Sequence, residues 1–216
     1  MKQLAVVAGV VVSLLGSTVA FAKAPPKAKT GFQLALRPGI AVPLGDVSEG
    51  AEMSDLLGVQ FPFTVDIGAK VIPNLFVGAY LGSSVGLPSG DLADVCDFAG
   101  KDCLAYGLRL GIQAQYHILP KQRANPWVGY GIGYEWLAIT DASDEAGEAI
   151  GFGGLEFAHF LAGLDFRLTP IFGVGPFADF SLGSYSTTSD GNDSSDIPRT
   201  ALHYWLTFGA RFVFFP

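Results

Sequence analysis

The chain has 216 residues, half of them hydrophobic, and its formal net charge is −7. An acidic chain of this length suits a single domain and argues against nucleic acid as a partner, because phosphates are bound by Lys and Arg. Beyond residue 22 the sequence contains no run of about 18 apolar residues, so no helix of the mature chain is predicted to cross a membrane.

The first 22 residues have the pattern of a secretory signal peptide. Lys2 gives a positive start, Leu4 to Leu15 form an apolar core, and Ala20-Phe21-Ala22 is a small-residue cleavage site. An uncleaved membrane anchor is the alternative, but the core is short for a span. We therefore expect a cleaved signal peptide over residues 1–22, export, and a flexible lead-in over residues 23–30.

From residue 31 onward, apolar and polar residues alternate with the period of a β-strand. The connections between the alternating segments are in turn short and long. This order places all long loops at one end of a closed antiparallel barrel and both mature termini at the other. We predict strands over residues 31–44, 59–71, 75–87, 104–119, 126–138, 155–168, 172–185 and 200–215.

The two faces of these strands distinguish a membrane barrel from a soluble one. One face is apolar and is assigned no charge, as expected in lipid, where one Arg or Lys at the bilayer midplane costs about 2–4 kcal/mol. The other face is rich in glycine, which suits a narrow lumen better than a water-facing surface. A lipocalin-like barrel, the alternative, would need a densely charged outer face. The sequence thus predicts an all-β fold, a single closed eight-stranded antiparallel transmembrane β-barrel over residues 31–216.

The inward face carries nine ionisable side chains and several bulky aromatic residues. Charges removed from bulk water need partners, so we expect ion pairs in the lumen. A packed polar core that holds the barrel together is one interpretation, and a gate of switchable salt bridges for small solutes or ions is the other. The nine predicted members of this lumen network are Arg37, Asp66, Lys70, Arg109, Glu135, Asp165, Arg167, Asp179 and Arg211.

Other inward residues bear on the same interpretations. Eight strands leave a lumen just wide enough for side chains, and we expect it to be filled by Phe76, Tyr80, Trp127, Phe177 and Trp205.

Three prolines fall within predicted strands, namely Pro38, Pro62 and Pro176. A closed barrel has no free edge at which a missing N–H could be tolerated, so we expect local bulges at these prolines.

The long connections are acidic. Together they hold 15 of the 20 acidic residues, which makes them candidates for binding cations or surface ligands, although none has an EF-hand spacing. Solvated loops that keep this surface soluble are the simpler interpretation. Cys96 and Cys103 lie in one of these loops, and export favours a disulfide between them over two free thiols.

The alternating stretch from Tyr204 to Phe215 resembles the barrel-assembly signal of the small OmpA/OmpX/OmpW-like outer-membrane barrels, and the architecture of residues 31–216 resembles that family too. The resemblance implies a bacterial outer-membrane location, lipid and lipopolysaccharide as surroundings, and insertion by the barrel-assembly machinery. It implies no single activity, since members include anchors, adhesins, channels and lipid-modifying enzymes.

We therefore predict an outer-membrane protein with a structural or narrow porin-like role. A surface-binding protein that acts through its four acidic loops is the alternative. No cofactor or metal site is predicted, and an enzyme is the least favoured reading because His117, His159 and His203 are all assigned to the inward face, without a serine at a spacing that suits nucleophilic catalysis.

Overall fold

The computed structural model describes residues 29–100, 102–141, 150–190 and 193–215. The predicted signal peptide and residues 23–28 of the predicted lead-in lie outside the described residues. Eight long strands form the wall, each antiparallel to the next. They are β1 (Gly31–Ser48), β3 (Leu57–Ile72), β4 (Leu75–Pro88), β5 (Cys103–His117), β6 (Ala124–Asp141), β7 (Ile150–Arg167), β8 (Phe172–Asp190) and β10 (His203–Phe214).

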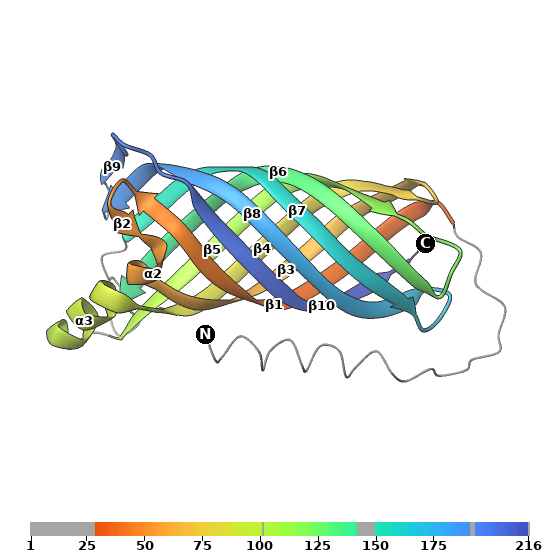
Figure 1. Ribbon diagram of the computed structural model, residues 1–216, viewed down its shortest axis with the longest axis horizontal. Helices are drawn as coiled ribbons and strands as arrows, with labels where there is room; N and C mark the ends of the chain where they lie inside the picture. Colours follow the sequence, from red (N-terminus) through yellow and green to blue (C-terminus); the bar gives the residue numbers. More distant parts are fainter. Residues whose placement is uncertain (1–28, 101, 142–149, 191–192, 216) are drawn as a thin grey trace, which may run out of the picture.

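The sheet closes on itself because β10 pairs with both β8 and β1 (Figure 1). Leu34 lies opposite Phe214 at one end of the closing ladder, and Gly45 lies opposite His203 at the other. The predicted closed barrel of eight antiparallel strands is confirmed.

The two ends of the barrel differ as the connection lengths predict. One end, which we call the turn end, has the three short connections, the start of β1 and the end of β10. The other, the loop end, carries two short strands and two helices that the sequence analysis did not predict. These are β2 (Ala51–Glu52), α2 (Met53–Leu56), α3 (Gly90–Ala99) and β9 (Asp193–Asp196). Among the described residues, neither helix is long and apolar enough to cross a bilayer.

Several strands run further toward the loop end than predicted. The strand β1 continues to Ser48 rather than residue 44, and β8 continues to Asp190 rather than residue 185. The added residues are mostly polar on both faces. The apolar alternation stops where the wall leaves the hydrocarbon, whereas backbone pairing between neighbouring strands continues beyond that point.

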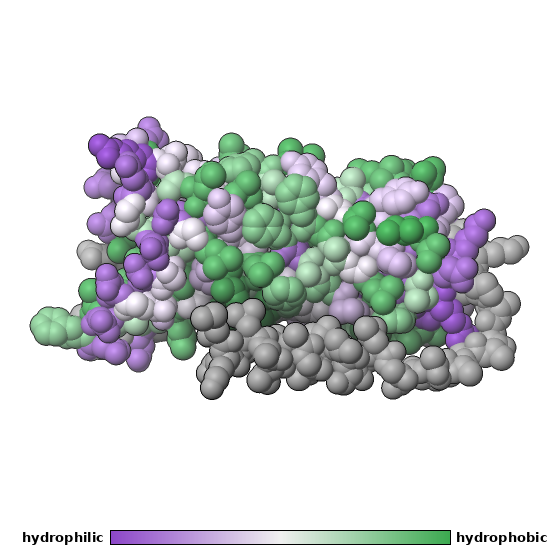
Figure 2. Space-filling view, viewed as in Figure 1, coloured by the Kyte–Doolittle hydropathy of each residue, from purple (hydrophilic) through white to green (hydrophobic). Residues whose placement is uncertain are grey.

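The outer wall is apolar over its middle, and hydrophilic residues gather toward the two ends (Figure 2). Large apolar side chains are exposed along the outer wall, for example Phe61, Leu110, Phe160 and Phe208. So much exposed apolar surface would be unusual in a soluble monomer, but it matches a hydrocarbon environment. The apolar face is therefore the lipid-facing wall.

The expected bulges at the three prolines are wrong. The pairing of Pro62 with Ser84 and of Pro176 with Ala210 keeps the register of the neighbouring residues, and the register of β1 is the same on both sides of Pro38. A proline lacks only its N–H, so an interrupted hydrogen bond is enough to accommodate it without an inserted residue.

A bulge occurs instead in β7, within the membrane-spanning part. Gly131 pairs with His159 and Gly133 with Glu156, so Phe157 and Ala158 together lie opposite Ile132. A bulge leaves a backbone group outside the ladder, and lipid offers it no hydrogen bond. Here the outward-facing Tyr130 hydroxyl donates to the Phe157 carbonyl oxygen over 2.9 Å.

Replacing Tyr130 with Phe removes this donor while retaining the ring. We expect Tyr130→Phe to lower the unfolding free energy by about 1–3 kcal/mol, because the Phe157 carbonyl is left unsatisfied in hydrocarbon. Urea unfolding in lipid vesicles measures the change. Tyr116→Phe is the control, since the Tyr116 hydroxyl has no hydrogen-bond partner among the described residues. Equal, small effects of both substitutions would contradict the assignment.

Candidate functional site in the barrel lumen

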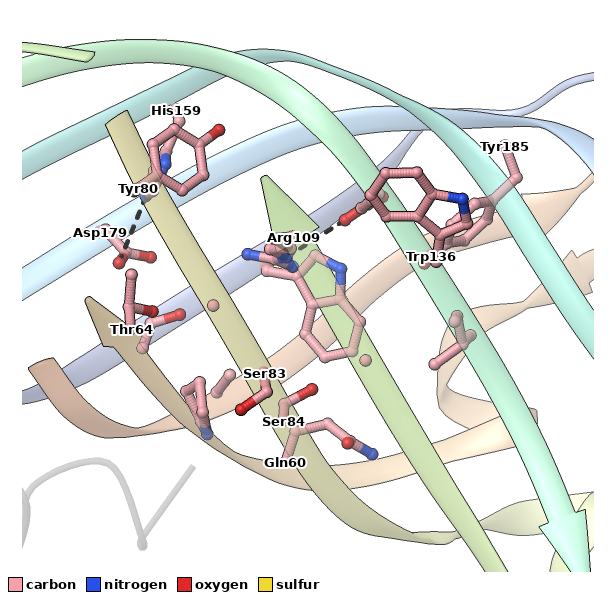
Figure 3. A pocket seen from close by; sticks show the side chains of 18 residues that line it. Gln60, Thr64, Tyr80, Ser83, Ser84, Arg109, Trp136, His159, Asp179 and Tyr185 are labelled. Atoms are coloured by element: carbon pink, nitrogen blue, oxygen red, sulfur yellow. Dashed lines mark ion pairs between the residues drawn. The ribbon is translucent and has the colours of Figure 1, made fainter. Parts of the chain in front are cut away.

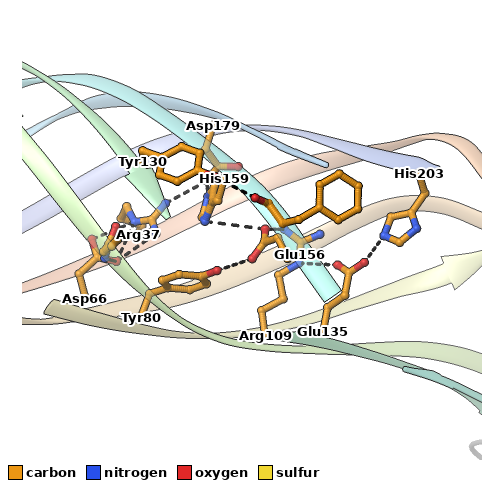
Figure 4. Close-up of polar contacts among 12 residues, drawn as sticks. Arg37, Asp66, Tyr80, Arg109, Tyr130, Glu135, Glu156, His159, Asp179 and His203 are labelled. Atoms are coloured by element: carbon orange, nitrogen blue, oxygen red, sulfur yellow. Dashed lines mark hydrogen bonds and ion pairs between the residues drawn. The ribbon is translucent and has the colours of Figure 1, made fainter. Parts of the chain in front are cut away.

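The structure places all nine predicted lumen residues on the inner face. Seven of them are almost completely buried, whereas Arg109 and Arg167 are partly exposed. Figure 4 shows how the central and loop-side members point toward one another across the lumen. Seven of the nine, without Lys70 and Arg167, form one continuous polar network with Tyr80, Glu156, three histidines and two glutamines. Each of the eight long strands contributes at least one side chain to it.

Arg37 is the centre of the network. Its guanidinium contacts Asp66 through Nη2 and Oδ1 at 3.0 Å, and contacts Asp179 through Nη1 and Oδ2 at 2.9 Å. Gln113 donates to the same Asp66 carboxylate at 2.8 Å. One arginine on β1 therefore links β3 and β8. Such a group lowers the free energy of the fold only while all its charges remain paired, because each is removed from water.

Toward the loop end, Arg109 contacts two carboxylates. Its Nε lies 3.3 Å from Glu135 Oε2, and its Nη1 lies 3.7 Å from Glu156 Oε1. His159 connects this group to the centre, with Nε2 3.4 Å from Asp179 Oδ2 and Nδ1 3.7 Å from Glu156. His203 contacts Glu135, and the Tyr80 hydroxyl donates to Glu156.

Toward the turn end, Arg211 takes the central position. Its Nη1 lies 2.7 Å from Asp165 Oδ2, and its Nη2 donates to Gln115 at 2.8 Å. The Trp127 indole donates to the same Asp165 carboxylate at 3.1 Å, while the Arg211 guanidinium lies over the Trp127 ring. Trp127 therefore fills space in the lumen and also contacts both members of the buried Arg211–Asp165 ion pair.

The sequence analysis missed one member, Glu156. Strict alternation from Phe160 would point Glu156 outward into lipid, yet its side chain is 1% exposed and faces the lumen. The bulge at Phe157 and Ala158 shifts the phase and turns it inward. A carboxylate on the predicted lipid face was itself the signal of that bulge. With Glu156, five lumen carboxylates balance five lumen cations.

Apolar clusters close the lumen at both ends. At the loop end, α2 inserts Met53 into the mouth, and Leu56 and Leu92 pack against the same residues. This loop-end cluster consists of Ala41, Val47, Met53, Leu57, Ala105, Leu137, Ile139, Tyr185 and Trp205. Toward the turn end, Trp127, Leu161 and Phe177 form a second cluster.

The turn end is further closed by the C-terminal strand. Phe214 points outward, as the predicted assembly signal requires, whereas Phe215 is buried against Ala35 and Val213. The Phe215 ring lies under the Arg167 guanidinium at 4.0 Å and near the Lys70 ammonium at 5.5 Å. These distances place both cations within reach of the ring face. The last aromatic residue thus belongs to the lumen packing.

Between these clusters a cavity of about 30 Å³ remains on the loop side (Figure 3). Its lining includes Gln60, Tyr80, Arg109, His159 and Asp179. Because one water needs roughly 10–15 Å³ of such space, the cavity holds about two waters and no larger solute.

The chain is similar to several solved barrel structures. Neisserial surface protein A is 14% identical, with 85% of this chain and 97% of that chain covered and a TM-score of 0.50. The outer membrane protein AlkL is 18% identical over 93% and 97% of the two chains, with a TM-score of 0.49. OprG from Pseudomonas aeruginosa is 12% identical over 88% and 100%, with a TM-score of 0.47.

The chain has the fold of the small eight-stranded outer-membrane β-barrels, as in Neisserial surface protein A. The comparison shows a likeness of fold, and the apolar outer wall of this chain is what that fold requires in a membrane. No protein-family model matches the sequence, and no curated protein matches it either.

The histidines of this barrel lie where the sequence analysis placed them. His117, His159 and His203 are all buried on the inner face. Ser181 lies directly opposite His159 on β8, but its hydroxyl has no hydrogen-bond partner among the described residues. A nucleophile needs such a contact with its base. The described part of the chain also contains no group of three or more His, Cys, Asp or Glu residues arranged to hold a metal ion.

The disulfide lies outside the lumen, at the loop end. Cys96 in α3 is bonded to Cys103 at the start of β5. The bond ties the helix to the wall of the barrel.

Removing the central cation tests the network. We expect Arg37→Met to lower the unfolding free energy by about 3–5 kcal/mol, because Asp66 and Asp179 remain buried without their partner. The control is Arg199→Met, which breaks a 3.0 Å pair with Glu49 whose arginine is 76% exposed, and should cost less than about 1 kcal/mol. Urea unfolding in vesicles provides both values.

If Arg37→Met does not fold, Arg37→Met combined with Asp66→Asn and Asp179→Asn should restore folding, because no unpaired charge of this group is then buried. Equal losses for Arg37→Met and Arg199→Met would show that the network contributes nothing measurable.

Proposed function

We propose that the protein is a structural barrel of the outer membrane whose lumen carries no flux of solute. The observation that supports this most strongly is the filled lumen, with apolar clusters at both ends and a paired polar network between them. A pore needs a continuous water-filled path, whereas the cavity on the loop side holds only about two waters. The interior is built to join the eight strands.

The surroundings of such a barrel follow from its surface. The lipid-facing wall fits the acyl chains of outer-membrane lipid and lipopolysaccharide. The outward aromatic residues of β10, Phe208, Phe212 and Phe214, alternate as the assembly signal of this family does. We therefore include the barrel-assembly machinery among its partners, for insertion rather than for activity.

A narrow porin-like channel is the second candidate. The observation in its favour is Arg109, whose side chain is 21% exposed and borders the cavity. Its contacts with Glu135 and Glu156, at 3.3 and 3.7 Å, are longer than those of Arg37. Opening a path here would also require α2 to leave the mouth of the barrel, which would expose Met53 and Leu57 to water.

Single-channel recording decides between these functions. We expect the refolded protein in planar bilayers to show no stable unitary current, because the loop-end cluster and Trp127 block both halves of the lumen. A heat-modifiable gel shift and protease protection in the same vesicles confirm that folded barrels are present. Uniform current steps from such barrels would overturn the structural proposal in favour of the channel.

A further inference from the structure

The loop end of the barrel is strongly acidic. Among the described residues there, Arg199 is the only cation, and it pairs with Glu49. The acidic residues at this end are Asp46, Glu49, Glu52, Asp55, Asp91, Asp94, Asp97, Asp102, Asp190, Asp193 and Asp196. Charge alone makes this end attractive to cations in general, without singling out any part of it.

The helix α3 adds an apolar feature to this charge. Phe98 is 97% exposed and Val95 is 62% exposed, three residues apart and therefore neighbours on one side of the helix. Phe98 is the most exposed large apolar residue among those described. Asp91 and Asp94 flank it on the helix surface, seven and four residues earlier.

The other side of α3 is fixed to the barrel. Leu92 packs against the loop-end cluster, and Cys96 is bonded to Cys103. The outer side is therefore presented in a set orientation, so a partner that binds it need not order the helix first. We call the surface formed by Asp91, Asp94, Val95, Asp97 and Phe98 the α3 face.

We propose that the α3 face is a docking surface for a basic polypeptide segment, in which Phe98 contacts an arginine or an adjacent apolar side chain while the aspartates pair with cations. Charge complementarity selects this partner, because the net charge of −7 makes a second copy of the chain repulsive. An anionic bilayer surface would be repelled by the same three aspartates.

The position of α3 also favours a polypeptide over the membrane surface as the binding partner of the α3 face. Figure 1 shows α3 at the far loop end, beyond the ends of the long strands, and Figure 2 shows an apolar protrusion at this tip, next to hydrophilic residues. A ring placed there projects away from the lipid-facing wall. A guanidinium group can lie over the face of such a ring while its N–H groups donate to the neighbouring carboxylates.

Peptide binding to the full-length, oxidised protein in lipid nanodiscs tests the proposal, with fluorescent nona-arginine as the probe at physiological ionic strength. We expect Phe98→Ser to weaken binding at least fivefold, and the pair Asp94→Asn with Asp97→Asn to do the same. The control is Asp190→Asn with Asp193→Asn, an equal change of charge at β8 and β9 that should alter binding less than twofold.

Several outcomes would overturn the docking surface. One is the absence of peptide binding to the unsubstituted protein. Another is equal weakening of binding by the two aspartate pairs together with no effect of Phe98→Ser, because that result would mean that the peptide responds only to the overall charge of the loop end. A third is the quenching, by bromine-labelled lipids, of the fluorescence that Phe98→Trp adds to that of the three native tryptophans of the unsubstituted protein, which would place α3 on the membrane. Because none of these measurements depends on current through the lumen, failure here leaves the structural proposal standing.

Discussion

Hydrocarbon accepts and donates no hydrogen bonds, and this constraint governs the rest of the molecule. Every backbone group in the wall must pair with a neighbouring strand, so the sheet has to close, and every charge on the strands must face inward. The inward charges then lie in a lumen too narrow for bulk water, where each needs a partner. The network around Arg37, Arg109 and Arg211 follows from these two requirements.

The same constraint explains the local irregularity of β7. The bulge at Phe157 and Ala158 brings Glu156 into the lumen, where Tyr80 and Arg109 meet it. Room for the Tyr80 hydroxyl comes from two paired glycines, Gly111 and Gly133, where an added Cβ would lie 2.4 Å from that oxygen. A bulge, a tyrosine and a glycine pair on four adjacent strands thus form one packing unit.

Much of this could be predicted from sequence, because alternation is a property of single strands. The barrel, its two ends and the inward position of Asp66 or Arg211 follow from period two alone. Glu156 was missed because a bulge resets the phase, and a bulge depends on neighbouring strands rather than on local composition. The helices α2 and α3 were missed because they are short, and α2 is held by the loop-end cluster rather than by its own periodicity.

The prolines show the opposite error. Pro62 and Pro176 were expected to force bulges, but each keeps the register of its strand, because losing one N–H does not require an additional residue. Pairing partners for the lumen charges could not be assigned from sequence either. Arg37 reaches Asp179 across 142 positions of the chain, a proximity that only the closed ring of strands creates.

Accessibility of spin labels on β5 tests the central claim, that hydrocarbon bathes the apolar wall. Nitroxides attached to single cysteines at Ile112 and Ala114 should collide mainly with oxygen, which dissolves in lipid, whereas a label at Asp94 should collide mainly with a water-soluble nickel chelate. Dominant collision with the nickel chelate at Ile112 and Ala114 in lipid vesicles would contradict the account.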